Sequence, residues 1–218
     1  GLGIADYNCG TLAAGALFQN LHETQKSDLS HMNSITPYVT DKYMLIDSSS
    51  RRNLELVETL REKQKRGSLL WVLDKTRTAM GARLLRSYVE QPLIDEDEIN
   101  ARLDAVEALT GQAMIREEIR EYLRPVYDLE RLVGRISYQS ANPRDLIAFK
   151  SSLQMLPYIK QLLNSFAGGA LAQIQEDLDP LEDLYQLVDA AIVEDPPDLM
   201  RDGGMINDGD NVMVDNYL

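Results

Sequence analysis

The chain of 218 residues contains one cysteine, two histidines and only 6% aromatic residues. A single cysteine excludes an internal disulfide, and Cys9, His22 and His31 are too few to complete a zinc site. Scarce aromatic side chains disfavour a β-sandwich or barrel, which draws on aromatic and β-branched residues. No apolar run reaches the length of a membrane span, and no signal peptide is visible. These absences predict a mainly α-helical protein of the reducing cytoplasm, without a membrane segment.

The short motifs that usually mark catalytic or nucleotide sites are also missing. The sequence has no G-x-x-x-x-G-K-[ST] phosphate loop that would cradle ATP, and no G-x-S-x-G nucleophile elbow. Residues 208–210 pair two aspartates around a glycine, but they lack the other ligand positions and the closing glutamate of a calcium loop. We therefore predict no catalytic, cofactor-binding or metal-binding residues in this chain.

Charge is distributed unevenly along the chain. The net charge is −13, and residues 176–218 hold thirteen acids and one arginine. Residues 51–86 are the exception, because ten Lys/Arg and four Asp/Glu leave a net charge of +6 there. The basic residues that we single out as DNA or interdomain contacts are Arg51, Arg52, Lys63, Lys65, Arg66 and Arg77. A basic patch is typical of nucleic-acid contacts, but solvated helix faces with intrahelical pairs, such as Glu58 with Arg61, have the same composition.

Helix-start residues and apolar spacing predict a multi-helix bundle. Asp47, Ser68, Thr78 and Asp95 each precede a segment with apolar residues three and four apart, and each can cap a helix. The predicted helical segments are 8–25, 48–66, 69–73, 79–90, 96–110, 113–123, 127–140, 144–166 and 181–193. Residues 35–46, rich in Ile, Tyr and Val, are instead expected to form a short extended or hairpin segment.

Some side chains are assigned to the interior or to ion pairs. The apolar residues of segment 96–110 that we expect to face inside are Ile99, Leu103, Val106 and Leu109. Pro157 is expected to kink or divide the helix over 144–166, because proline removes a backbone donor. The polar residues expected to form ion pairs, in preference to a reactive site, are Asp128, Glu130, Arg131 and Arg135.

Several motifs resemble a known family. From Asp47 the chain reads D-x-x-S-R-R-N-L-E-L, and from Ser68 it reads S-L-L-W-V-L-D-K-T-x-T-x-M-G-x-R-L-L-R-x-x-V-x-x-P-L. Residues 127–136 read Y-D-L-E-R-L-V-G-R-I and are followed by N-P-R-D-L, and residues 201–211 read R-D-G-G-x-I-x-x-G-x-N. In sequence and spacing these motifs are similar to the core, or lever, domain of the MutS family of DNA mismatch-repair proteins.

The resemblance implies an arrangement of segments. Residues 1–28 would be the C-terminal helix of a connector domain, 29–47 an extended link, and 48–218 the helical core domain, truncated before the clamp. In that family, other domains read the mismatch, grip the duplex and hydrolyse ATP. The resemblance therefore implies a non-catalytic fragment of a DNA-dependent ATPase. The parent would bind mismatched duplex DNA, use ATP and Mg and form a homodimer, and this fragment would contact other domains of the same chain.

Three functional hypotheses follow. The first is a stiff helical element that couples DNA binding to the ATPase domain of the parent. The second is an independent DNA-contacting module that uses the basic stretch 51–86, and the third is an enzyme with carboxylate chemistry, for which no converging set of residues can be named. The resemblance does not separate mismatch repair from the recombination branch of the family, although the connector helix favours mismatch repair. Since the chain begins at Gly1 without methionine, we expect a piece of a longer protein.

Overall fold

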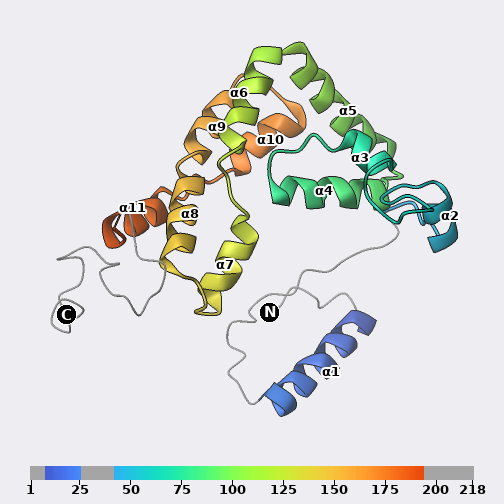
Figure 1. Cartoon of the computed structure of the whole chain (residues 1–218), viewed down its shortest axis with the longest axis horizontal. Coiled ribbons are helices and arrows are strands. Elements are labelled where there is room, and N and C mark those ends of the chain that lie inside the picture. The colour runs from blue at the N-terminus through green and yellow to red at the C-terminus, as the bar shows by residue number, and fades with distance from the viewer. Residues whose placement is uncertain (1–7, 26–41, 194–218) are drawn as a thin grey trace. The chain divides into compact units, whose positions relative to one another are not determined.

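The structure is a computed structural model that describes residues 8–25 and 42–193. The chain divides into two compact units, Gly1–Tyr43 and Met44–Leu218. The described residues form helices α1 to α11 and no β-strand, which confirms the mainly α-helical fold (Figure 1). Most of the extended segment expected near residues 35–46 lies outside the described residues, as do residues 201–211.

The first unit contains helix α1 (Asn8–Gln25), with the bounds that the sequence predicts. Two of its large apolar side chains are well exposed within the described residues, Leu12 at 75% and Leu17 at 59%. This helix therefore presents apolar surface that the described part of its own unit does not cover.

The second unit begins with a short helix where a long one was expected. The Asp47 carboxylate caps α2 (Ser48–Asn53) by accepting bonds from the backbone N–H groups of Ser49 and Ser50, at 2.9 and 3.0 Å. The prediction of a helix from 48 to 66 is wrong, because α2 ends at Asn53 and Glu55 adopts a left-handed conformation with φ 47°.

A nonlocal backbone interaction explains that helix end. The N–H groups of Leu69 and Leu70 donate to the carbonyls of Glu55 and Leu56, at 3.0 and 2.8 Å. The first turn of α3 (Leu69–Leu73) thus takes its hydrogen-bond partners from the segment that helical spacing assigned to the preceding helix. Residues 54–67 form a non-helical loop as a result.

Most of the remaining helices follow the predicted caps and stops closely. They are α4 (Ala79–Glu90), α5 (Glu96–Gly111), α6 (Ala113–Leu123), α7 (Leu129–Ser137), α8 (Pro143–Leu153), α9 (Leu156–Leu163), α10 (Gly169–Asp177) and α11 (Glu182–Ala191). Ser68, Thr78 and Asp95 cap α3, α4 and α5 as expected. The helix expected over 144–166 divides into α8 and α9 just before Pro157, and α10 was not predicted.

Among the described residues of the second unit, the buried apolar side chains form three separate clusters. The first is formed by Leu56, Val57 and Leu70, with Ile46, Leu85 and Val89 packed against them. The second joins α5, α6, α9 and α10 around Ile159, Leu163, Phe166 and Leu171. The third joins α7, α8 and α11 around Leu132, Phe149 and Leu153. In Figure 1, α2 and α3 lie at one end of this unit and α11 lies at the other.

The interior face of α5 was predicted incorrectly for most of its residues. Leu109 packs against the second cluster as expected, and Ala105 accompanies it. Leu103 and Val106 are 58% and 60% exposed, and Ile99 is 36% exposed. The helix carries apolar residues on two faces, and its neighbours α6 and α10 cover only the face that bears Ala105.

Candidate functional site

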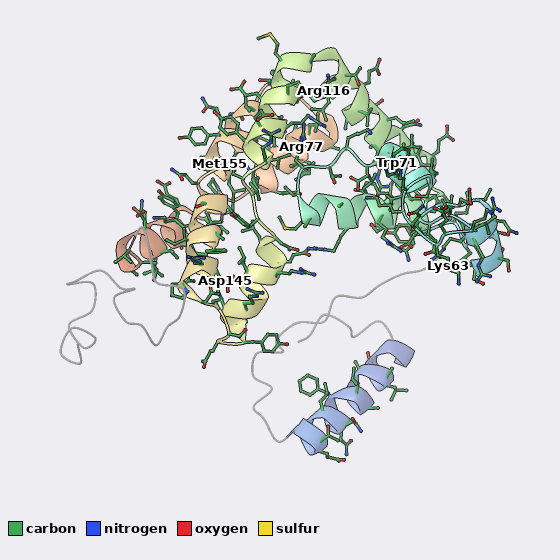
Figure 2. All side chains as sticks on the ribbon, in the orientation of Figure 1. Lys63, Trp71, Arg77, Arg116, Asp145 and Met155 are labelled. Carbon is green, nitrogen blue, oxygen red and sulfur yellow. The ribbon has the colours of Figure 1, made fainter. Side chains whose placement is uncertain are left out.

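The six basic residues singled out from the sequence do not form one site. Arg51 and Arg52 belong to α2, while Lys63, Lys65 and Arg66 lie in the loop over 54–67. Arg77 precedes α4, and Figure 2 shows it toward the middle of the second unit, well away from Lys63. The six side chains are therefore distributed over α2, the loop over 54–67 and the segment before α4.

Two of the six are held by carboxylates within the fold. The Lys65 ammonium bonds the Asp74 carboxylate, which also accepts bonds from the Thr76 N–H at 3.1 Å and hydroxyl at 2.6 Å. The Lys65 bond, followed by those of Thr76, lowers the pKa of Asp74 to about 2. Arg51 lies 4.0 Å from a Glu90 carboxylate oxygen on α4. Both side chains thus tie the loop and α2 to neighbouring elements.

Backbone bonds close the loop into a tight turn. The Thr59 N–H donates to the Gln64 carbonyl at 2.9 Å, and the Lys63 N–H donates to the Thr59 carbonyl at 3.1 Å. The Leu60 N–H donates to the Glu55 carboxylate at 2.7 Å. Gly67 ends the turn with φ 93°, and a β-carbon there would lie 3.2 Å from the Thr59 methyl. The backbone around Thr59 and Lys63 is therefore set by specific bonds and by close packing against Gly67.

This turn and α2 line a small pocket. Its walls are Arg52, Glu58, Thr59, Leu60 and Lys63, and its volume is about 210 Å³. The Thr59 hydroxyl oxygen is buried without a hydrogen-bond partner. The Arg52 and Lys63 side chains make no ion pair among the described residues. The pocket therefore brings two exposed basic side chains next to one carboxylate, while the Thr59 hydroxyl oxygen is buried within the turn.

A second polar cluster joins α4 to α7. The Arg83 guanidinium donates to both oxygens of Asp128, at 2.6 and 2.9 Å, and also bonds Glu130. The same carboxylate caps α7 by accepting from the Arg131 N–H at 3.3 Å. The Arg83 bonds hold the pKa of Asp128 at about 2 and raise the pKa of Arg83. We call these three side chains, Arg83, Asp128 and Glu130, the clasp.

The ion pairs predicted in this region are confirmed. Arg131 lies 3.7 Å from Asp128, and Arg135 bonds both oxygens of Asp145 on α8, at 2.7 and 3.0 Å. Asp145 also completes a capping box with Asn142. These acids and arginines are engaged with one another across helices, as structural ion pairs are. Arg83 was missing from the predicted set because its partners lie about forty-five residues away.

Over 8–25 and 42–193, no three or more His, Cys, Asp or Glu side chains gather as a metal site requires. None of the helices in that part of the chain combines the length and apolar character needed to cross a bilayer.

Comparison with known proteins decides the family. The family model for MutS domain III matches residues 49–213. The chain belongs to the MutS domain III family. Two similar relatives are both named DNA mismatch repair protein MutS. The protein from Lachnoclostridium phytofermentans is 63% identical over 99% of this chain, and that from Ruminiclostridium cellulolyticum is 51% identical over 98%.

The chain spans about a quarter of the length of these relatives, 23% and 24% respectively. The MutS domain III match covers α2 from its second residue and all of α3 to α11, so the buried residues of the three apolar clusters, the clasp and the pocket lie within that domain. The matched range begins at residue 49, two residues after Asp47, where the first family motif starts.

Proposed function

We propose that this chain is a non-catalytic coupling element of a DNA mismatch-repair protein. It carries motion between the part of the parent that binds mismatched duplex DNA and the part that hydrolyses ATP with Mg. The observation that carries this proposal is the alignment of 99% of the chain, at 63% identity, with a DNA mismatch repair protein. The parent acts as a homodimer in the cytoplasm.

Segment boundaries follow from the same proposal. Residues 1–28 end the connector domain, 29–47 form the link and 48–218 form the core. The boundary between the two compact units, at Tyr43 and Met44, supports this division because it falls inside the proposed link. A link at that position lets the connector and the core move as separate bodies.

The arrangement of the apolar clusters supports a mechanical role. Close-packed interiors deform little, so helices that share a cluster move together. The first cluster is linked to the other helices through polar contacts: the clasp, Arg102 stacked 3.6 Å above the Tyr88 ring, and an Arg120 bond to the Lys75 carbonyl at 3.3 Å. Half-exposed polar contacts can exchange partners at lower cost than a shared apolar core. The clasp joins α4, which packs on the first cluster, to α7, which belongs to the third. It is therefore the place where these two packed parts change their relative position.

A chimera tests this proposal in a complete protein. This chain replaces the matching 23% of the Lachnoclostridium phytofermentans relative, and ATP hydrolysis is measured with homoduplex and mismatched duplex DNA. We expect the chimera to respond to mismatched DNA as its parent does. The double variant Arg83→Met with Asp128→Asn should keep mismatch affinity and basal hydrolysis, but lose most of the response of hydrolysis to DNA.

Matched controls separate coupling from folding. Arg124→Gln removes the C-cap arginine of α6, which is 64% exposed and whose one ion pair among the described residues is with Glu121, and it should leave the response to DNA unchanged. Catalysis by the isolated chain would contradict the proposal, as would a clasp variant whose response to mismatched DNA equals that of the unaltered chimera.

A further inference from the structure

Helix α5 has a second apolar face that its described neighbours leave exposed. Ala105 and Leu109 pack against the second cluster, where α6 and α10 contact the helix. Ile99, Leu103 and Val106 lie on another side of α5 and are 36%, 58% and 60% exposed. Figure 1 shows α5 at the upper edge of the second unit, between α3 and α6. We call Ile99, Leu103 and Val106 the outer stripe.

The spacing of these three residues indicates what can cover them. They follow one another at intervals of four and three positions, so they form one continuous line along the helix, about 10 Å long. Single apolar side chains are ordinary on a protein surface. A line at this spacing is instead the pattern by which one helix packs on another. The outer stripe therefore fits a second helix.

Unpaired acids border the outer stripe on one side. At about 100° per residue, Glu96 and Glu107 lie next to the stripe around the helix, and both are exposed. Neither has an ion pair among the described residues, and Asp104 adds a like charge three positions before Glu107. On α6, by contrast, Arg120 lies 3.4 Å from Glu117. The surface beside the stripe is therefore negative and without a cation of its own.

The other parts of this chain do not supply the missing positive charge. Residues 1–43 hold four acids and two lysines, and residues 194–218 hold seven acids and one arginine. A second copy of α5 would bring the same acids opposite one another, and a nucleic acid would bring phosphates, so like charges repel in both cases. The chain spans about a quarter of the length of its relatives. Most of a complete protein is therefore available to supply the partner.

We propose that the outer stripe binds an amphipathic helix from the rest of the mismatch-repair protein. That helix carries apolar residues three and four positions apart, and Lys or Arg along one edge. Its apolar residues cover Leu103 and Val106, and its cations pair with Glu96 and Glu107. Burial of the stripe supplies most of the attraction, while the exposed pairs set the orientation and the choice of partner.

The inference rests on the proposal that this chain is part of a longer mismatch-repair protein, and it does not require movement at the clasp. The coupling proposal is judged by the response of ATP hydrolysis to DNA. The experiments below measure the exposure of the outer stripe and the identity of its partner. The two proposals can therefore fail separately.

Thiol accessibility in the chimera tests whether the stripe is covered. Val106→Cys places a thiol in the stripe, and Ala108→Cys places one at an exposed position on nearly the opposite side of α5. Each thiol reacts with a maleimide in the isolated chain and in the chimera, and mass spectrometry of its peptide gives the rate. We expect the Val106→Cys thiol to react about tenfold or more slowly in the chimera, and the Ala108→Cys thiol to change less than about threefold. Equal slowing of both thiols, or none at Val106→Cys, would overturn the inference.

A charge reversal tests the chemistry of the partner. Glu107→Lys removes the repulsion from Asp104 and puts a cation near the C-terminal end of α5, so the thermal midpoint of the isolated chain should stay unchanged or rise. In the chimera the new cation faces the basic edge of the partner, so the Val106→Cys thiol should react about threefold or more faster than without it. Glu118→Lys makes the same charge change at an exposed position of α6 and should not alter that rate. Equal effects of the two substitutions, or none from Glu107→Lys, contradict a basic partner.

Photo-crosslinking identifies the occupant of the stripe. A benzophenone amino acid replaces Leu103 in the chimera, and the cross-linked peptides are sequenced by mass spectrometry. We expect a peptide from outside the 218-residue segment, with apolar residues three and four positions apart and Lys or Arg beside them. A cross-link to residues 1–43 or 194–218, to α5 of a second copy or to duplex DNA refutes the assignment, as does the absence of any cross-link.

Discussion

Breaking the clasp should destabilise the second unit by an amount that depends on pH. Arg83 on α4 and Asp128 at the start of α7 are joined by two hydrogen bonds of 2.6 and 2.9 Å. Asp128→Asn removes the charge but keeps a good helix cap, so it isolates the ion pair from the capping role. Arg83→Met removes the guanidinium and keeps a long, unbranched side chain. The two single variants and the double variant form a double-mutant cycle.

The size of the coupling energy follows from the pKa of Asp128 and from the exposure of the two side chains. A fall in the pKa of Asp128 from 3.8 to about 2 sets a ceiling of roughly 2 kcal/mol on its interactions in the folded state. The Asp128 side chain is 14% exposed but that of Arg83 is 45% exposed, and solvent screening reduces such pairs substantially. We therefore expect a coupling energy of about 1 kcal/mol at pH 6, the upper end for an exposed pair with bidentate geometry.

The pH dependence has a defined sign. Because the folded pKa of Asp128 lies below its unfolded value, the stabilisation is fully present above pH 3.8 and is lost as the pH falls through 2. Linkage predicts that the difference in free energy of unfolding between the original chain and Asp128→Asn at pH 3 is about half of its value at pH 6.

Urea unfolding followed by fluorescence of Trp71, the single tryptophan, measures this cycle at both pH values. A coupling energy indistinguishable from zero at pH 6, or one that is unchanged at pH 3, refutes the assignment of the clasp. Arg131→Gln serves as the control, since Arg131 is 82% exposed and lies 3.7 Å from Asp128, and its coupling should be much smaller.

Three further substitutions, two of them with a matched control, test the fold by urea unfolding. Gly67→Ala should cost about 1–2 kcal/mol, because φ is 93° and the new methyl would lie 3.2 Å from the Thr59 side chain, whereas Gly134→Ala, in α7 with nothing within 4 Å, should stabilise by up to about 1 kcal/mol. Leu153→Ala should cost about 2–5 kcal/mol, since Leu153 is 1% exposed at the centre of the third cluster. Asn142→Ala should cost about 1 kcal/mol by removing the capping box of α8, while Asn142→Asp should cost much less. Equal stability of Gly67→Ala and Gly134→Ala, or a loss below about 1 kcal/mol at Leu153, would contradict these assignments.

Local signals in the sequence were sufficient for most helix boundaries. Asp47, Ser68, Thr78 and Asp95 cap the helices that follow them, because a short polar side chain before an apolar segment satisfies free N–H groups wherever that segment packs. Pro157 separates α8 from α9 for an equally local reason, the missing donor of proline. The family motifs are local too, and the MutS domain III match confirms what they indicated.

For the basic stretch 51–86, the sequence did not show which side chains lie together or which are paired. Charge alone placed Arg51, Lys65 and Arg77 in one candidate site with Lys63. In the structure Lys65 is neutralised by Asp74, and Arg77 lies elsewhere in the unit. Pairing of a cation depends on which carboxylate the fold brings near it, and composition does not contain that information.

What the sequence alone determined, then, is most of the helices, most of their ends and the family. Tertiary structure decided the loop over 54–67, because the N–H groups of Leu69 and Leu70 compete for carbonyls that helical spacing had assigned locally. It also decided which face of α5 is buried, since Leu103 and Ala105 are both apolar and only neighbouring helices distinguish them. Caps act over three or four residues, whereas burial and ion pairing depend on partners tens of residues away, as Arg83 and Asp128 are.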